Sequence, residues 1–125
     1  MTRALLIIAH GSRRQAANEE FRQQVAAIAS RAPHDMVEAA FLELAEPGIE
    51  DGITQLATAG ATVIDVFPLF LNAGRHVSED IPTDVDSARK RLPGVQINLL
   101  DYLGKSPDLL DLVAALVTTA AESAK

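Results

Sequence analysis

Short apolar runs alternate with segments of helical periodicity along the whole chain. Four largely apolar runs have the length of strands that are covered on both faces: 4–9, 36–44, 61–71 and 95–100. Each is followed by apolar residues at helical spacing, within 17–28, 49–57, 81–92 and 109–117. Pro and Gly mark the helix boundaries, and Ser106-Pro107-Asp108 has the cap, the early proline and the first-turn acid of a helix start.

This order predicts one α/β domain over residues 1–125. Strand and helix alternate four times, so each crossover should be right-handed and helices should cover both faces of a four-stranded parallel sheet. We expect the flavodoxin-like strand order 2-1-3-4, which places the first strand between the second and the third. Ligands on such sheets bind beyond the carboxyl ends of the strands, at the point where the strand order reverses.

Two histidines lie where this topology expects a ligand. His10 directly follows the first apolar run, and His76 lies in a polar loop that starts at Asn72, beyond the third run, and enters a helix near Pro82. Each has a structural alternative, because His10 could cap backbone groups at the strand end and His76 could be a surface loop residue. Their position at one sheet edge favours a shared site.

Carboxylates and arginines accompany the two histidines. Glu43 stands among apolar neighbours at the end of the second run, where a carboxylate is either paired or functional. Glu46 has a simpler role, because it precedes Pro47 and suits the N-terminus of the next helix. The third histidine, His34, lies at the opposite end of the predicted sheet, and we expect it to be an exposed loop residue. Three arginines at the first edge favour binding of an anion: Arg13, Arg14 and Arg75.

Composition excludes several classes of function. Seventeen acidic and eleven basic residues give a net charge of −6, and aromatic residues are only 4% of the chain. A nucleic-acid-binding protein needs a positive surface and aromatic platforms, so we expect no nucleic acid partner. The absence of cysteine excludes disulfides and thiolate metal sites. The apolar run before His10 is too short for a signal peptide or a membrane span, which predicts a soluble cytoplasmic protein.

The predicted site has chemistry suited to metals and protons. Imidazole and carboxylate are ligands for divalent transition metals. An unperturbed imidazole titrates at about 6.5 and can therefore accept a proton near neutral pH. Residue types alone leave both roles open.

Three blocks of the sequence, in this order, resemble a known family. They are Leu6-Ile-Ile-Ala-His10-Gly-Ser-Arg, Phe41-Leu-Glu43-Leu-Ala-Glu46-Pro and Pro68-Leu-Phe-Leu-Asn-Ala-Gly-Arg-His76-Val-Ser-Glu-Asp80-Ile-Pro82. The set is similar to the class II tetrapyrrole chelatases, and most of all to the small CbiX-type and SirB-type sirohydrochlorin chelatases. The resemblance covers most of the chain.

That resemblance implies insertion of Co²⁺, Fe²⁺ or Ni²⁺ into sirohydrochlorin, without ATP or an organic cofactor. It implies that His10 and His76 bind the metal and accept protons, with Glu43 as their acidic partner. The carboxylates of the substrate would meet polar groups at the same edge: Ser12, Arg13, Arg14, Asn72, Gly74 and Arg75. Long family members contain two such domains, so this chain resembles the short forms that act as homodimers. No histidine-rich tract for metal storage is present.

Two other functions compete with this interpretation. A non-catalytic carrier of metal or tetrapyrrole would use the same histidines. The His10-Gly11 pair is also similar to part of the Arg-His-Gly motif of histidine phosphatases, but Ala9 stands where the phosphate-binding arginine belongs.

Overall fold

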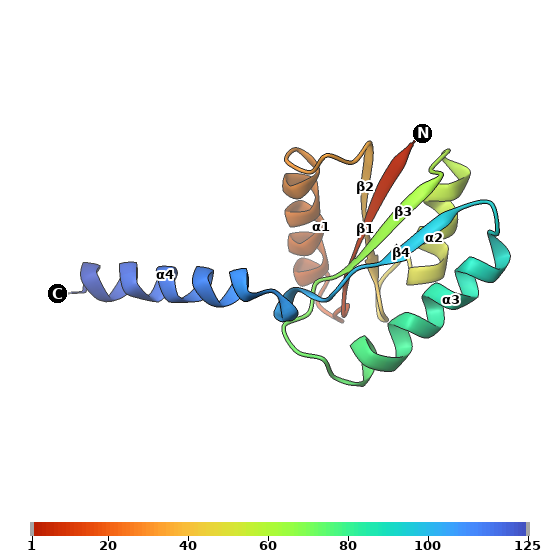
Figure 1. The fold of residues 1–125 in the computed structure, drawn as a ribbon. Helices are drawn as coiled ribbons and strands as arrows, with labels where there is room; N and C mark the ends of the chain where they lie inside the picture. Colours follow the sequence, from red (N-terminus) through yellow and green to blue (C-terminus); the bar gives the residue numbers. More distant parts are fainter. Residues whose placement is uncertain (1, 125) are drawn as a thin grey trace.

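Strands and helices alternate in the computed structural model, which describes residues 2–124 (Figure 1). Two short helical turns, η1 (His76–Asp80) and η2 (Leu103–Lys105), precede α3 and α4. The longer elements are β1 (Arg3–Ala9), α1 (Gln15–Ala29), β2 (Met36–Phe41), α2 (Ile49–Thr58), β3 (Val63–Pro68), α3 (Ile81–Arg91), β4 (Gln96–Leu99) and α4 (Pro107–Ser123).

The four strands form one parallel sheet in the order β2-β1-β3-β4, which confirms the expected topology. At its carboxyl edge Ala9 of β1 pairs with Phe41 of β2, and Ile8 pairs with Pro68 of β3. The segments that leave these three strands therefore start side by side.

Each face of the sheet buries its own apolar cluster. On one face Leu6, Ile8 and Ile64 pack with residues of α2 and α3, among them Ile53 and Val85. On the other face Leu5 and Ile7 pack with Phe21 and Val25 of α1. Alternate residues of β1 thus point to opposite faces, as a strand covered on both sides requires.

Two strands end three residues earlier than the sequence predicts, and β4 is shorter than predicted by one residue at each end. β2 ends at Phe41 rather than at residue 44, and β3 ends at Pro68 rather than at residue 71. Leu44 has a positive φ of 67°, which interrupts the extended backbone. Pro68 has no N–H to donate, so it weakens the ladder where β3 ends. The early ends leave Glu43 and residues 69–75 free to form loops.

α4 departs from the prediction that the helices cover the sheet. It leaves the body at the carboxyl end of the sheet and extends away from it on the side of α1 (Figure 1). None of its residues is buried, although Ser106 caps it as predicted by accepting a hydrogen bond from the Asp108 N–H. Among the described residues, no helix is long and apolar enough to cross a membrane.

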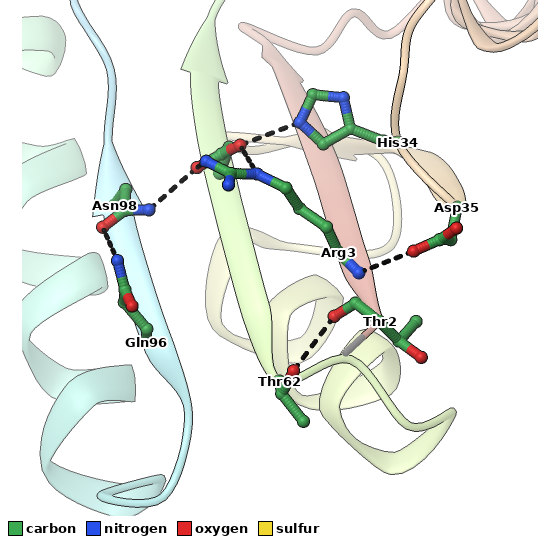
Figure 2. Close-up of polar contacts among 8 residues, drawn as sticks. Thr2, Arg3, His34, Asp35, Thr62, Gln96 and Asn98 are labelled. Atoms are coloured by element: carbon green, nitrogen blue, oxygen red, sulfur yellow. Dashed lines mark hydrogen bonds and ion pairs between the residues drawn. The ribbon is translucent and has the colours of Figure 1, made fainter.

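The amino end of the sheet holds a polar cluster around the buried carboxylate of Asp65 (Figure 2). Arg3, His34 and Asn98 all bond to this carboxylate, at 2.8 to 3.2 Å. The expectation that His34 is exposed is therefore wrong, because its side chain is only 12% exposed. His34 lies at the opposite end of the sheet from His10 and His76, as predicted.

Candidate functional site

His10 lies in a short loop between β1 and α1 that is held by a buried amide. Asn18 of α1 is 2% exposed; it accepts a hydrogen bond from the Ser12 N–H and donates one to the Ser12 carbonyl. The Ser12 hydroxyl in turn accepts a bond from the Arg14 N–H. These bonds fix the loop beyond β1 and present the His10 ring at the surface.

The loop after β2 brings Glu43 to His10. The Glu43 N–H donates to the His10 carbonyl, and Gly11 lies so close that an added Cβ would be 1.8 Å from the Glu43 carbonyl oxygen. Gly11 also has a φ of 93°, a conformation that glycine adopts readily. With the backbones in contact, His10 Nε2 lies 3.2 Å from Glu43 Oε1. Both side chains are about half exposed.

His76 is positioned by a turn of helix rather than by a polar loop. The sequence predicts a helix from about Pro82, but helical geometry begins at His76, in the π-helical turn η1. The Ser78 N–H and hydroxyl both bond to the Gly74 carbonyl at the start of this turn. Because His76 and Asp80 are one turn apart, they face each other, and His76 Nδ1 is 2.6 Å from Asp80 Oδ2.

The two predicted histidines meet. Their ring centroids are 5.0 Å apart with the planes at 81°, and the Phe70 ring lies 6.5 Å from His10. Each imidazole has one nitrogen beside a carboxylate, Glu43 for His10 and Asp80 for His76. If those nitrogens donate to the carboxylates, the opposite nitrogens carry the lone pairs, which can bind a cation or a proton.

A cavity of about 270 Å³ opens beside His76. Its walls include the carboxylates of Glu43, Asp80 and Asp84. Burial raises the pKa of Asp84, and the nearby charges of Glu50 and Asp80 raise it further. Among residues 2–124, no group of three or more side chains has the geometry of a complete metal site. The site therefore offers pairs of ligands beside an acidic cavity.

The predicted substrate-binding residues lie in the segments that follow β1 and β3. Arg13, Arg14, Asn72 and Gly74 are exposed, and Arg75 lies 3.4 Å from Glu79 in a surface ion pair. Ser12 uses its backbone and hydroxyl to support the His10 loop. Glu46 is exposed, and its backbone carbonyl accepts a bond from Arg22. Contacts of these residues with a substrate remain predictions.

Sequence reasoning missed two residues that shape the site. Asn18 stands at helical spacing with Phe21 and Val25 on the apolar face of α1, and a polar residue there signals a specific bond. Asp80 lies four residues after His76, a spacing that would have predicted contact only if the helix had been expected to begin at His76.

A family model described as CbiX matches residues 4–120. The chain is 36% identical over 109 residues to the chloroplastic sirohydrochlorin ferrochelatase of Arabidopsis thaliana, an alignment that covers 87% of this chain and 48% of that protein. The chain thus spans about half the length of the first curated relatives that it matches.

Solved structures give the same result. The sirohydrochlorin chelatase SirB of Bacillus subtilis subspecies spizizenii, in complex with cobalt, superposes with a TM-score of 0.85 at 31% identity, over 95% of this chain and 51% of that one. A protein of Marinobacter aquaeolei VT8, described as a putative cobalamin biosynthesis CbiX protein, superposes with a TM-score of 0.82 at 28% identity, over 97% and 98% of the two chains. With its βαβα order, its paired histidines and this match over nearly its whole length, the chain belongs to the CbiX family of class II chelatases.

Proposed function

We propose that this protein inserts a divalent metal ion into sirohydrochlorin without ATP. The observation that carries the proposal is the approach of His10 and His76, whose ring centroids are 5.0 Å apart although 66 positions separate them in the sequence. Membership of the CbiX family supports it, and so do the ferrochelatase and chelatase activities in the names of its relatives.

The site suits a reaction that exchanges a cation for protons. Two pyrrole N–H protons leave the macrocycle as one M²⁺ enters, so the balance needs a ligand for the incoming metal and an acceptor for the protons. The free nitrogen of either imidazole can act as the metal ligand or as the proton acceptor. The carboxylates of Glu43 and Asp80 stabilise the imidazolium once it forms. Protons then pass to solvent, since both rings are partly exposed.

In the proposed reaction the metal is a substrate that passes from the protein to the macrocycle. A site that leaves some coordination positions of the metal unfilled suits this transfer. Imidazole nitrogen and carboxylate oxygen accept Co²⁺, Fe²⁺ and Ni²⁺, with affinities that follow the Irving–Williams order. A pair of imidazole ligands holds such an ion less tightly than a closed structural site with four ligands does. We propose His10 and His76 as the metal ligands and no organic cofactor.

The rim of the site is suited to an anionic macrocycle. Arg13, Arg14 and Arg75 can bind the peripheral carboxylates of sirohydrochlorin, and Ser12, Asn72 and Gly74 provide polar groups on the same rim. We propose that two copies of this chain form a homodimer that supplies both halves of one cavity.

The decisive experiment is a turnover assay. The purified protein is mixed with excess sirohydrochlorin and, in turn, Co²⁺, Fe²⁺ or Ni²⁺, and metallation is followed by the absorption spectrum. We expect more than one metallated macrocycle per chain and a rate above the uncatalysed one. Product that stops at one equivalent would identify a carrier. His10→Ala and His76→Ala should each abolish turnover and leave thermal unfolding unchanged, because both rings are on the surface.

A further inference from the structure

The helix that carries His76 is continuous from Arg75 to Arg91 and contains one widened turn. The backbone is right-handed helical at Arg75, Asp80 and Ile81, so η1 and α3 follow each other without a break. In η1 the hydrogen bonds span one residue more than in an α-helix, because the Ile81 N–H donates to the carbonyl of His76, five residues earlier. The turn between these two residues therefore contains one residue more than a regular α-turn.

A proline directly after the widened turn explains why it is wide. Pro82 is the second residue of α3, a position that normally tolerates proline, but here residues 75–80 are already helical and Pro82 lies inside the helix. Proline has no N–H, and in a regular helix its ring meets the carbonyl four positions earlier, which is that of Ser78. Widening the turn before the proline moves this carbonyl away from the ring.

The buried face of α3 shows where the widened turn directs His76. Ile81, Val85 and Ala88 are each 0% exposed, and they fix the rotation of the helix against the core. A regular α-helix would place His76 about 140° around the axis from Ile81, whereas one residue more in the turn brings it nearly into line. His76 is accordingly half-buried, and Ser78, which regular spacing would place near the buried face, is exposed.

The partners of His76 lie on the side that this rotation selects. The His10 ring lies 5.0 Å from the His76 ring, and Glu43 lines the same cavity as His76. If the turn closed to a regular α-turn, the segment before it would rotate by about 100° relative to α3. The His76 ring would then leave the side of the helix on which it meets His10.

We propose that Pro82 is a positioning residue for His76, which keeps η1 one residue wide and so directs the imidazole toward His10. Its consequence for metallation rests on the function proposed above. The proline ring has no group that binds a metal or a proton, so Pro82 acts through the backbone alone. A proline inside a helix is unfavourable compared with alanine. Loss of Pro82 should therefore lower activity without lowering stability, which loss of a merely structural residue does not do.

NMR of the Pro82→Ala variant tests the width of the turn. Alanine restores the N–H and favours a regular α-helix, so we expect the turn to close and His76 to rotate away from His10. The chain has three histidines, so protein labelled only at histidine gives a simple spectrum. The nuclear Overhauser effect between the His10 and His76 rings should disappear, while the signals of His34, at the far end of the sheet, stay in place. An effect that persists in Pro82→Ala would overturn the proposal.

Shortening the turn by one residue provides a rescue. In Pro82→Ala with deletion of Glu79, a regular α-turn again brings His76 into line with the buried face of α3. Glu79 suits the deletion because its side chain is 66% exposed and makes only a surface ion pair with Arg75. We expect the ring-to-ring effect to return in this double variant. Its continued absence would show that Pro82 does not act through the width of the turn, which would also overturn the proposal.

Thermal unfolding and metallation complete the test. Pro82→Ala should unfold at the same temperature as the unmodified chain or higher, and its metallation rate should fall on the order of 100-fold, as when a reacting group is misplaced by about 1 Å. Pro93→Ala, an exposed change beyond the other end of α3, should leave the NMR effect and metallation unchanged. A lower unfolding temperature, or full activity of Pro82→Ala when the unmodified chain is active, would contradict the proposal. The NMR measurement needs neither metal nor macrocycle, so it tests the turn even if the chelatase activity fails.

Discussion

At the scale of single residues, the site consists of two imidazoles that are each oriented by a carboxylate. The shorter bond joins His76 Nδ1 to Asp80 Oδ2, at 2.6 Å. Such a partner fixes the tautomer and the ring plane of a metal-binding histidine, which leaves its Nε2 lone pair toward the ligand. Asp80 is therefore a positioning residue for His76 in the proposed reaction.

Asp80→Asn should lower the metallation rate by about 10- to 100-fold, the usual effect of losing such a partner. An amide can either accept from or donate to Nδ1, so His76 loses its single favoured tautomer. The measurement is steady-state metallation together with binding of Co²⁺ by titration, and both should weaken. Asp86→Asn removes an exposed acid of α3 that pairs with Arg89, and its activity should equal that of the unmodified protein. Equal activity in Asp80→Asn would remove this residue from the site.

At the scale of elements, the site depends on the contact between the loops that follow β1 and β2. Gly11 allows their backbones to meet, and Asp65 connects β1, β3 and β4 at the far end of the sheet. The first contact places His10 beside Glu43, whereas the second affects only stability.

Gly11→Ala should destabilise the fold by about 1–3 kcal/mol and impair metallation. The added Cβ meets the Glu43 carbonyl oxygen, and the left-handed backbone at Gly11 disfavours any side chain. Urea unfolding gives the stability and the turnover assay gives the activity. Gly94→Ala is the matched control, because a Cβ there meets nothing within 4 Å and φ is not positive. A Gly11→Ala protein as stable as Gly94→Ala would contradict this account.

The Asp65 cluster predicts that the free energy of unfolding falls at acidic pH. Burial alone raises the pKa of Asp65, but the bonds from Arg3, Asn98 and His34 outweigh it and hold the pKa at about 2, below its ordinary 3.8. A carboxyl group with a lowered folded-state pKa contributes stability above the unfolded-state pKa and loses it as pH falls toward the folded value. The contribution is about 2 kcal/mol and should disappear between pH 4 and pH 2.

Urea midpoints measured from pH 2 to pH 6 test this expectation. The unmodified chain should lose stability over that range by more than Asp65→Asn does, because the amide cannot titrate. Asp65→Asn should itself be less stable at neutral pH, since Arg3 loses its charged partner. If the urea midpoints of the two proteins fall in parallel with pH, other carboxyl groups cause the loss of stability at low pH.

At the scale of the whole molecule, residues 2–124 form one four-stranded sheet with a solvent-exposed histidine site at its carboxyl edge. One helix, α4, has no buried residue. The open site and the uncovered α4 lie at the same end of the sheet. The net charge of −6 would repel the anionic macrocycle of the proposed reaction at long range, so its binding would depend on local arginines.

If two copies share the cavity, specific activity should fall on dilution. The fall should follow the dissociation of the dimer, measured in the same buffer by sedimentation, because a monomer offers only one pair of imidazoles. Adding an inactive His10→Ala chain to dilute unmodified protein should restore part of the activity if the partner contributes other groups. Constant specific activity through the monomer range would argue for a site complete in one chain.

Much of the fold and of the site could be predicted from the sequence. The strand order 2-1-3-4, the pairing of His10 with His76 and the place of Glu43 beside them are all confirmed by the structure. These depend on strand periodicity and right-handed crossovers, which are local or general rules. The length of β2 and the partner of His76 depend on local departures from regular backbone, and the exposure of His34 depends on a contact with a distant residue. At these three points the sequence was a poorer guide.

The sequence by itself determined which residues reach the carboxyl edge, because alternating apolar runs and helical stripes predict a parallel sheet, and the ends of parallel strands share one edge. Tertiary structure alone decided how the groups meet at that edge. The contact of Gly11 with Glu43 and the facing of His76 and Asp80 arise from backbone paths that deviate from regular strand and loop. It also decided that α4 leaves the sheet, since a pattern of apolar residues shows that a helix must be covered but not which surface covers it.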